Sequence, residues 1–218
     1  MAQPARSLGE LTDWTGSDRS VSYGLLVSSA DEVRELALSE FATVGYAGTS
    51  INRIALAAGL SKSAVLYHFA SKEALLDAAI RPAIDRMERM FLKLEASPLT
   101  LDASRAFLAD FTDFLLDHRL EVHMFINQGP TLVDVPVIAR ANALVQRLSD
   151  YFGSNTSSVE EKMRFGIALG GAAYMLCSQH SAEFESVPRE EMRAALVSIL
   201  GGLLDSVPTA ESASNPGI

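Results

Sequence analysis

The 24 residues Thr49–Lys72 constrain this chain most, because they read as two short helices, a glycine turn between them and the start of a third helix. Each predicted helix begins with a hydroxyl side chain: Thr49 or Ser50, Ser61 and Ser71. Such a hydroxyl can accept a hydrogen bond from an unpaired N–H of the first helical turn. Gly59 suits the left-handed position that ends a helix. Two helices joined by a short turn containing glycine predict a helix-turn-helix, whose second helix enters the major groove of DNA.

The same stretch is cationic within an acidic protein. It holds Arg53, Lys62 and Lys72 and no acid, whereas the whole chain of 218 residues has a formal net charge of −9. An acidic body suppresses nonspecific adhesion to nucleic acid, while a small basic face can still dock. The charge pattern therefore favours duplex DNA as the partner.

Small, cationic and hydrogen-bonding side chains follow one another along the second helix and its flanks. Its leading edge is expected to face the bases, where an amine suits guanine and a methyl group suits thymine: Lys62, Ser63 and Ala64. Phosphate contacts are expected from donors around it: Thr49, Tyr67, His68 and Lys72. Leu66 and Phe69 are predicted to face inward. Taken singly, each polar side chain is equally an ordinary surface group.

The longer segment Val33–Leu76 resembles the N-terminal DNA-binding domain of the tetracycline-repressor (TetR) family. The matching positions are Phe41, Gly45-Tyr46, Thr49-Ser50, Ile54-Ala55, Ala58-Gly59, Ser61, Leu66-Tyr67-His68-Phe69 and Ser71-Lys72-Glu73-Ala74-Leu75. The resemblance implies an all-helical, homodimeric, ligand-responsive transcriptional regulator, most often a repressor. By position it also implies base contacts from Lys62, Ser63 and Ala64 and phosphate contacts from Tyr67, His68 and Lys72. It identifies no ligand.

Composition argues against several other classes of protein. No stretch reaches the roughly 18 consecutive apolar residues of a membrane span, and no secretory leader is visible, so we expect a cytoplasmic protein without membrane contact. Cys177 is the only cysteine and lacks a neighbour that would activate a nucleophile, although His180 lies three residues away. No nucleotide-binding or hydrolase motif occurs. We therefore predict no catalytic residue, no metal and no cofactor.

Helical periodicity continues along the chain, and no strand-like alternation is visible, which predicts an all-α fold. We predict four parts: a flexible arm (1–28), the helix-turn-helix domain (29–80), a ligand-binding and dimerisation domain (81–207) and a disordered tail (208–218). An alternative for the arm is that it packs on the core through Trp14 or reaches DNA. Pro82 lies inside the long helix that begins near Ser71, where we expect a kink or a short break that acts as a hinge. A helix end with a new start is the alternative.

Apolar spacing in the body predicts a dimer interface and a ligand pocket. The last two helices are expected to form a four-helix contact with a second copy through Ile167, Gly170, Gly171, Leu196, Ile199, Leu200 and Leu203. A mostly apolar pocket is expected between helices, lined by Met87, Phe91, Phe107, Phe111, Met124, Phe125, Gln128 and Tyr174, with His123 and Asn127 as further polar candidates. Ordinary core packing is the alternative for each residue.

These features together predict a ligand-responsive DNA-binding regulator. We expect a repressor that binds a near-palindromic operator as a dimer and is released by a small, mostly apolar effector. The alternative is a small-molecule-binding helical protein or an enzyme without a DNA-binding role.

Overall fold

The computed structural model describes residues 19–96, 98, 100–156, 158–177 and 186–204, which form helices connected by short turns and contain no strand. The predicted all-α class is confirmed. The elements in chain order are α1 (Arg19–Thr43), α2 (Ile51–Ala57), α3 (Lys62–His68), α4 (Lys72–Glu95), α5 (Leu101–Asp117), α6 (Arg119–Gln128), the 3₁₀ turn η1 (Gly129–Thr131), α7 (Pro136–Asn155), α8 (Val159–Cys177) and α9 (Arg189–Leu204).

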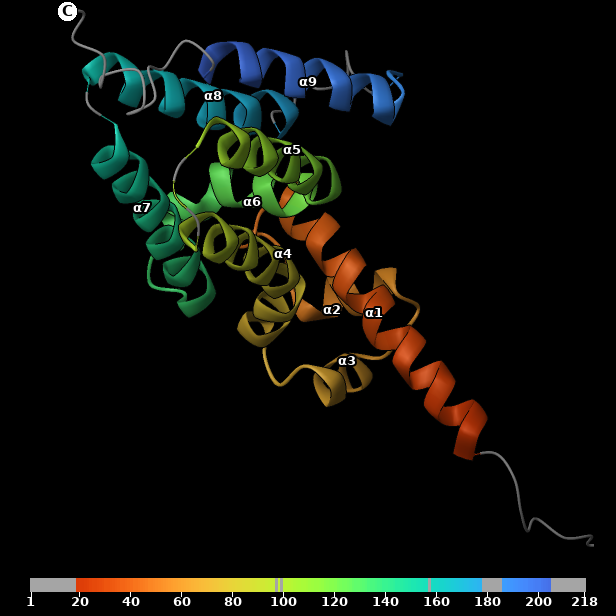
Figure 1. Cartoon of the computed structure of the whole chain (residues 1–218). Coiled ribbons are helices and arrows are strands. Elements are labelled where there is room, and N and C mark those ends of the chain that lie inside the picture. Colours follow the sequence, from red (N-terminus) through yellow and green to blue (C-terminus); the bar gives the residue numbers. More distant parts are fainter. Residues whose placement is uncertain (1–18, 97, 99, 157, 178–185, 205–218) are drawn as a thin grey trace, which may run out of the picture.

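The helices form an elongated molecule with two distinct ends (Figure 1). Helices α2 and α3 lie at one end, where α1 packs against α4 and α2 against α3. Helices α8 and α9 run side by side at the opposite end. The helices α4, α5, α6 and α7 lie between, and both α4 and α6 contact α1, so they join the two ends.

The predicted arm differs from the structure in its second half. Helix α1 begins at Arg19, so residues 19–28 are helical in backbone, whereas they were expected to lie in an arm without regular structure. Residues 1–18 of that arm, including Trp14, and the tail 208–218 lie outside the described residues.

Helix α4 continues through Pro82 without a break. The predicted short break near Pro82 is therefore wrong, and so is the alternative that one helix ends there and another begins. Pro82 is exposed and Ala78, whose carbonyl loses its N–H partner, is half-buried, so water reaches this side of the helix. That position lowers the cost of the missing backbone hydrogen bond.

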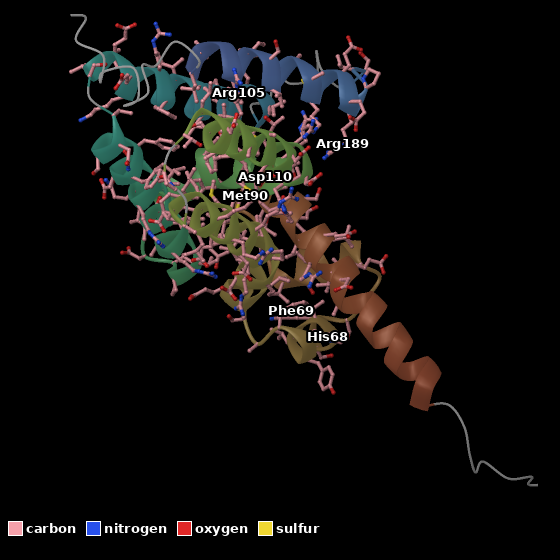
Figure 2. The ribbon with its side chains drawn as sticks, in the orientation of Figure 1. His68, Phe69, Met90, Arg105, Asp110 and Arg189 are labelled. Atoms are coloured by element: carbon pink, nitrogen blue, oxygen red, sulfur yellow. The ribbon has the colours of Figure 1, made fainter. Side chains whose placement is uncertain are left out.

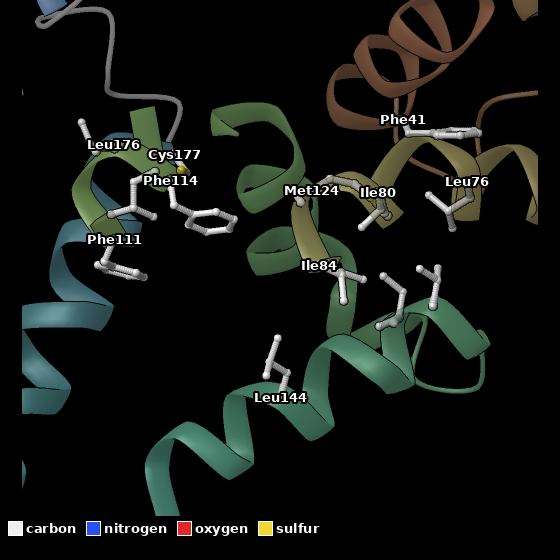
Figure 3. Close-up of a cluster of buried hydrophobic side chains, with 14 of the residues drawn as sticks. Phe41, Leu76, Ile80, Ile84, Phe111, Phe114, Met124, Leu144, Leu176 and Cys177 are labelled. Carbon is white, nitrogen blue, oxygen red and sulfur yellow. The ribbon is translucent and has the colours of Figure 1, made fainter. Parts of the chain in front are cut away.

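One hydrophobic core runs from the helix-turn-helix end into the body (Figure 3). Phe41 and Leu76 belong to it at the first end, Ile80 and Met124 in the middle, and Phe114 in the body. These five side chains are at most 3% exposed. Because the core is continuous, a displacement of the body's helices reaches the helix-turn-helix through packed side chains.

One of the two residues predicted to face inward near α3 is buried and the other is not. Val65 and Phe69 are buried, whereas Leu66 is 38% exposed. Residues i and i+4 share a helix face, and Leu66 lies about 100° around the helix from Val65. A helix of only seven residues shows too little of its period for the sequence to fix its inward face.

Candidate nucleic-acid interface

The turn between α2 and α3 is built from hydrogen bonds that the local sequence supplies. Ser50 caps α2 by accepting from the Arg53 N–H at 3.2 Å. At the other end, Gly59 has φ of +66°, and the Leu60 N–H donates to the Ala55 carbonyl at 2.8 Å. This is the six-to-one bond of a Schellman ending, which needs the left-handed residue that glycine provides. The turn therefore fixes the angle between the two helices.

Helix α3 presents its leading edge to solvent. Ser61 caps it by accepting from the Ala64 N–H at 3.1 Å, and the Ser61 and Ser63 hydroxyls lie 2.9 Å apart. Lys62 and Ser63 are exposed, and Ala64 is half-buried. Figure 2 places His68, at the end of α3, at the opposite end of the molecule from Arg189 of α9. The three residues predicted to face bases therefore share one outward edge.

The four residues predicted to contact phosphates are not equally accessible. Tyr67 is 80% exposed, and its ring packs edge-on against that of His68 at 5.4 Å between centroids. Lys72 is half-buried, and its Nζ lies 4.1 Å from the centroid of the Tyr46 ring. Burial lowers the pKa of Lys72 from its ordinary value.

Thr49 is only 2% exposed, and its hydroxyl donates within 2.9 Å of the Gly45 carbonyl and 3.2 Å of the Glu40 carbonyl. Its side chain is committed to closing the loop before α2, while the exposed Ser50 is the cap. The Thr49 hydroxyl is therefore not accessible to a phosphate, contrary to the prediction.

An ion pair reduces the positive charge of the segment. Arg53 on α2 donates through Nε to the carboxylate of Glu40 on α1. That hydrogen bond raises the pKa of Arg53 above its already high value, so the guanidinium stays charged. The segment Thr49–Lys72 contains no acid, but the fold brings Glu40 to it. Its other two cations are Lys62, the first residue of α3, and Lys72, the first residue of α4.

Known proteins with similar sequences show which family this helix-turn-helix belongs to. Residues 33–79 match the sequence model of the bacterial regulatory proteins of the tetR family. The negative transcriptional regulator IcaR of a biofilm operon in Staphylococcus aureus strain Newman is 22% identical over 163 residues, which are 72% of this chain and 88% of IcaR. The transcriptional regulator RutR of Escherichia coli O157:H7 is 32% identical over 131 residues, which are 58% of this chain and 54% of RutR. The chain belongs to the TetR family.

Solved TetR-like structures share the fold over most of the chain. The ketosteroid transcriptional regulator KstR2 of Mycobacterium tuberculosis superposes with a TM-score of 0.59 at 16% identity, over 83% of this chain and 95% of KstR2. The structure of AibR in complex with isovaleryl coenzyme A and operator DNA gives a TM-score of 0.57 at 20% identity, over 79% of this chain and 97% of AibR. As a TetR-family member, this protein is a DNA-binding transcriptional regulator of a non-enzymatic family.

The body of this TetR protein contains a cavity of about 320 Å³ between α4, α5, α6, α7 and α8, which opens to solvent beside the exposed Val145 and Tyr174. Its wall is almost entirely carbon, and Figure 3 shows Ile84, Phe111, Phe114 and Leu144 around one space. Four of the eight residues predicted to line a pocket do so: Met87, Phe111, Phe125 and Tyr174. Apolar side chains that were not predicted from the sequence complete the wall, among them Ile80, Ile84, Val122, Ile126, Leu144 and Leu148.

The other predicted pocket residues lie elsewhere. Phe91 and Phe107 are buried among neighbouring rings, and Met124 is fully buried in the core. Gln128 bonds to the backbone of the helix-turn-helix end, 82 or more residues earlier in the chain. The two further polar candidates also have internal partners. His123 bonds to the Cys177 carbonyl, and Asn127 donates to the His123 carbonyl at 2.9 Å.

The predicted dimer residues divide into exposed and buried sets. Ile167 and Ile199 are each 60% exposed, and Gly170 and Gly171, which lie beside Ile167 on α8, are both exposed. Leu196 and Leu200 are at most 8% exposed and pack in the subunit's own core, and Leu203 is half-buried. Periodicity placed all seven on apolar stripes, but it could not separate the inner stripe of α9 from the outer one.

The structure also bears on a cysteine nucleophile, a metal site and a membrane span. Burial raises the pKa of the Cys177 thiol to about 11, so the group is a neutral thiol at neutral pH. His180, its suggested partner, lies outside the described residues. Within the described part of the chain, no cluster of three His, Cys, Asp or Glu side chains is arranged to hold a metal, and no helix could span a membrane.

Proposed function

We propose that this protein represses transcription by binding a near-palindromic operator as a dimer, and that a small apolar effector releases it. The outward leading edge of α3 is the observation that carries the proposal. Lys62, Ser63 and Ala64 would face base edges, and Tyr67, His68 and Lys72 would contact phosphates. IcaR, similar over most of its own length, is a negative regulator, which favours repression.

The proposed dimer contact is the accessible apolar stripe of α8 together with Ile199 of α9. On α8 the accessible residues recur at helical spacing: Met163, Gly166, Ile167, Gly170, Gly171 and Tyr174. A Cβ added at Gly166, Gly170 or Gly171 would meet no atom within 4 Å, so this face is open and flat enough for another helix to approach. Exposed apolar patches of this kind mark association surfaces. A symmetric dimer would place two recognition helices on half-sites about 34–36 Å apart or a multiple of that.

The cavity restricts the charge of the effector. Glu121 is the only charged side chain among the described residues of its wall, and its carboxylate lies 2.9 Å from Nδ1 of His118. One imidazole can offset at most one carboxylate charge, so this pair supplies no net positive charge. A negative headgroup would therefore be buried in an apolar site without a countercharge, which is costly. We propose a neutral or cationic effector, unlike the isovaleryl coenzyme A bound by AibR.

Titration of the protein with DNA from its own upstream region tests the DNA-binding part of the proposal. A labelled fragment should bind with a dissociation constant that rises steeply between about 50 and 200 mM salt, because phosphate contacts release counterions. A scrambled fragment of equal length should bind far more weakly. Equal affinity for both fragments at every salt concentration would contradict sequence-specific recognition.

The effector proposal is tested with three probes that share a chain of eight carbons and differ in their headgroup: octanol, octyltrimethylammonium and octanoate. Each is added below its micellar concentration to the protein–DNA complex. We expect octanol or octyltrimethylammonium to lower operator affinity, and octanoate to have the weakest effect. Glu121→Gln should remove any preference for the cation over octanol. Release by octanoate alone would overturn the assignment of effector charge while leaving operator binding intact.

A further inference from the structure

Gln128, at the end of α6, joins the body directly to the helix-turn-helix end. Its Oε1 accepts from the Tyr46 N–H at 2.6 Å, and its Nε2 donates to the Phe41 carbonyl at 2.5 Å. Both partners are backbone groups more than 80 residues earlier in the chain. The side chain is half-buried. One amide therefore spans the contact between α6 and the end of α1.

This position makes Gln128 a cap for α1 from another part of the chain. Phe41 lies in the last turn of α1, where carbonyl groups have no helical partner. Tyr46 follows in the loop that leads to α2, directly after Gly45, which has φ of +90°. Removing the amide would leave a partly buried backbone donor and acceptor without this partner, and an unpaired backbone group is costly to the extent that it is shielded from water.

The loop held by Gln128 is also the part of the chain that positions α2 and α4. The Thr49 N–H donates to the Gly45 carbonyl at 3.1 Å immediately before the cap of α2. The Tyr46 ring lies under Lys72 at the start of α4 and 5.3 Å from the Phe41 ring. A shift of this loop would therefore move the helices on both sides of α3.

The same helix α6 forms one wall of the effector cavity. Val122, Phe125 and Ile126 line that cavity, all within two turns before Gln128. Residues of one short helix move together, because its backbone hydrogen bonds make it rigid. A ligand that displaces these side chains would move the amide of Gln128 relative to Phe41 and Tyr46.

We propose that Gln128 is the positioning residue through which occupancy of the cavity changes the orientation of the helix-turn-helix. The proposal rests on the function proposed above, because it concerns how an effector reaches α3. The bond pair holds the loop in one register with α6, and displacement of α6 breaks or shifts both bonds at once. Apolar contacts between packed helices tolerate sliding more easily than two directed hydrogen bonds do.

Hydrogen exchange of residues 41–48 tests the bond pair without DNA or ligand. Gln128→Leu removes donor and acceptor at similar volume, and we expect exchange of this segment to rise at least about tenfold, the factor that 1.4 kcal/mol corresponds to. Asn127→Leu is the matched control, since Asn127 is exposed and bonds within its own helix. Unchanged exchange in α5 shows that Gln128→Leu remains folded. Gln128→Glu keeps an acceptor for Tyr46 but loses the donor for Phe41, so it should give an intermediate rate.

A double-mutant cycle tests transmission from the cavity. Ile126→Ala alters the α6 wall and should raise exchange in residues 41–48 of the otherwise natural protein but add nothing in the Gln128→Leu background. Leu148→Ala alters the α7 wall of the same cavity and should leave this segment unchanged. An Ile126→Ala effect that persists at full size without Gln128 overturns the proposal. The proposal is also overturned if residues 41–48 exchange in Gln128→Leu at the same rate as in the natural protein.

The operator assay provides the regulatory readout, with octanol as the probe. Gln128→Leu should reduce the octanol effect on operator affinity to within about twofold of none, while the affinity for octanol itself stays unchanged. A variant that retains the full octanol effect contradicts the proposal. If octanol leaves the natural protein bound to DNA, the effector assignment fails instead, and the exchange cycle still decides the role of Gln128.

Discussion

The helix-turn-helix end and the body of this protein differ in how completely their interiors are filled. At the first end, short helices close tightly on fully buried side chains such as Val65 and Leu75, and polar groups face outward. The body packs longer helices around a cavity of about 320 Å³ and leaves an apolar stripe of α8 exposed. A closed end suits recognition of a rigid duplex, whereas an open interior suits a small ligand. The predictions below test this difference, beginning with the largest expected effect.

Truncating a phenylalanine should cost far more at the filled end than at the cavity. Phe41 is fully buried, so Phe41→Ala should lower the free energy of unfolding by about 3–5 kcal/mol and weaken DNA binding. Phe125 lines the cavity and is half-buried, so Phe125→Ala should cost less than half as much. Urea unfolding of both variants measures the difference. Equal losses would show that the two interiors are packed alike.

Charge on the exposed stripe should disrupt assembly without unfolding the chain. Ile167→Asp is expected to raise the dimer dissociation constant about a hundredfold, because a carboxylate would be buried between two helices. Val133→Asp is the control, since Val133 is 52% exposed and belongs to the turn between η1 and α7 rather than to α8 or α9. Sedimentation at several protein concentrations provides the measurement. A variant at Ile167 that stays dimeric would place the interface elsewhere.

Adding a methyl group should have opposite effects at two glycines. Gly59 has φ of +66° in the helix-turn-helix, so Gly59→Ala should cost about 1–2 kcal/mol of stability. Gly153 lies within α7, where an added Cβ would meet no atom within 4 Å, so Gly153→Ala should stabilise by about 0.4–1 kcal/mol. The midpoint of urea unfolding measures the change in stability of each variant. Loss of stability at Gly153 similar to that at Gly59 would remove the distinction between a required turn and an ordinary helical position.

The parts of the fold that follow local rules could be predicted from the sequence. The caps at Ser50, Ser61 and Ser71 and the left-handed Gly59 were all expected, because each depends on a few neighbouring residues. Helix α1 extends ten residues further toward the N-terminus than predicted, from Ser29 to Arg19, where no sustained apolar period marks it. Phe69 is buried as predicted, but Leu66 was assigned to the inward face that Val65 occupies, since a helix as short as α3 hardly defines a helical phase.

The parts of the site that depend on distant contacts could not be predicted. Spacing shows that Phe107 and Phe111 face inward, but only the packing of several helices shows that Phe111 borders a space and Phe107 does not. Gln128 was expected to line the ligand pocket. Its partners Phe41 and Tyr46 are far away in sequence, so no local signal pointed to them. Likewise, nothing near Arg53 indicated its pairing with Glu40.

Acid should loosen the far end of the body slightly before the rest of the molecule. Arg193 of α9 donates to Asp113 of α5 at 2.7 and 2.9 Å, and these bonds hold the pKa of that carboxyl below its ordinary value of 3.8, although burial acts in the opposite direction. When the pKa of a carboxyl is lower in the folded protein than in the unfolded chain, its contribution to stability is complete at a pH above the unfolded-state pKa. That contribution is lost as the pH falls through the folded-state pKa. The pair is partly exposed, so its effect is small.

Hydrogen exchange of α9 between about pH 6 and pH 3 measures that effect. The natural protein should lose protection in α9 below about pH 4. Asp113→Asn should show lower protection near neutral pH and less change on acidification. Identical pH profiles for the two proteins would mean that this pair contributes nothing to the docking of α9.

The central claim is that the outward edge of α3 reads DNA sequence, and the most direct measurement compares base preferences with and without Lys62. The natural protein and Lys62→Ala are titrated against a set of operator variants, each with one base pair changed in both half-sites. Lys62→Ala should lose about 1–3 kcal/mol of discrimination at one base pair and keep its preferences at the others. If Lys62→Ala ranks every operator variant as the natural protein does and with the same ratios of affinity, this edge does not read bases and the account is contradicted.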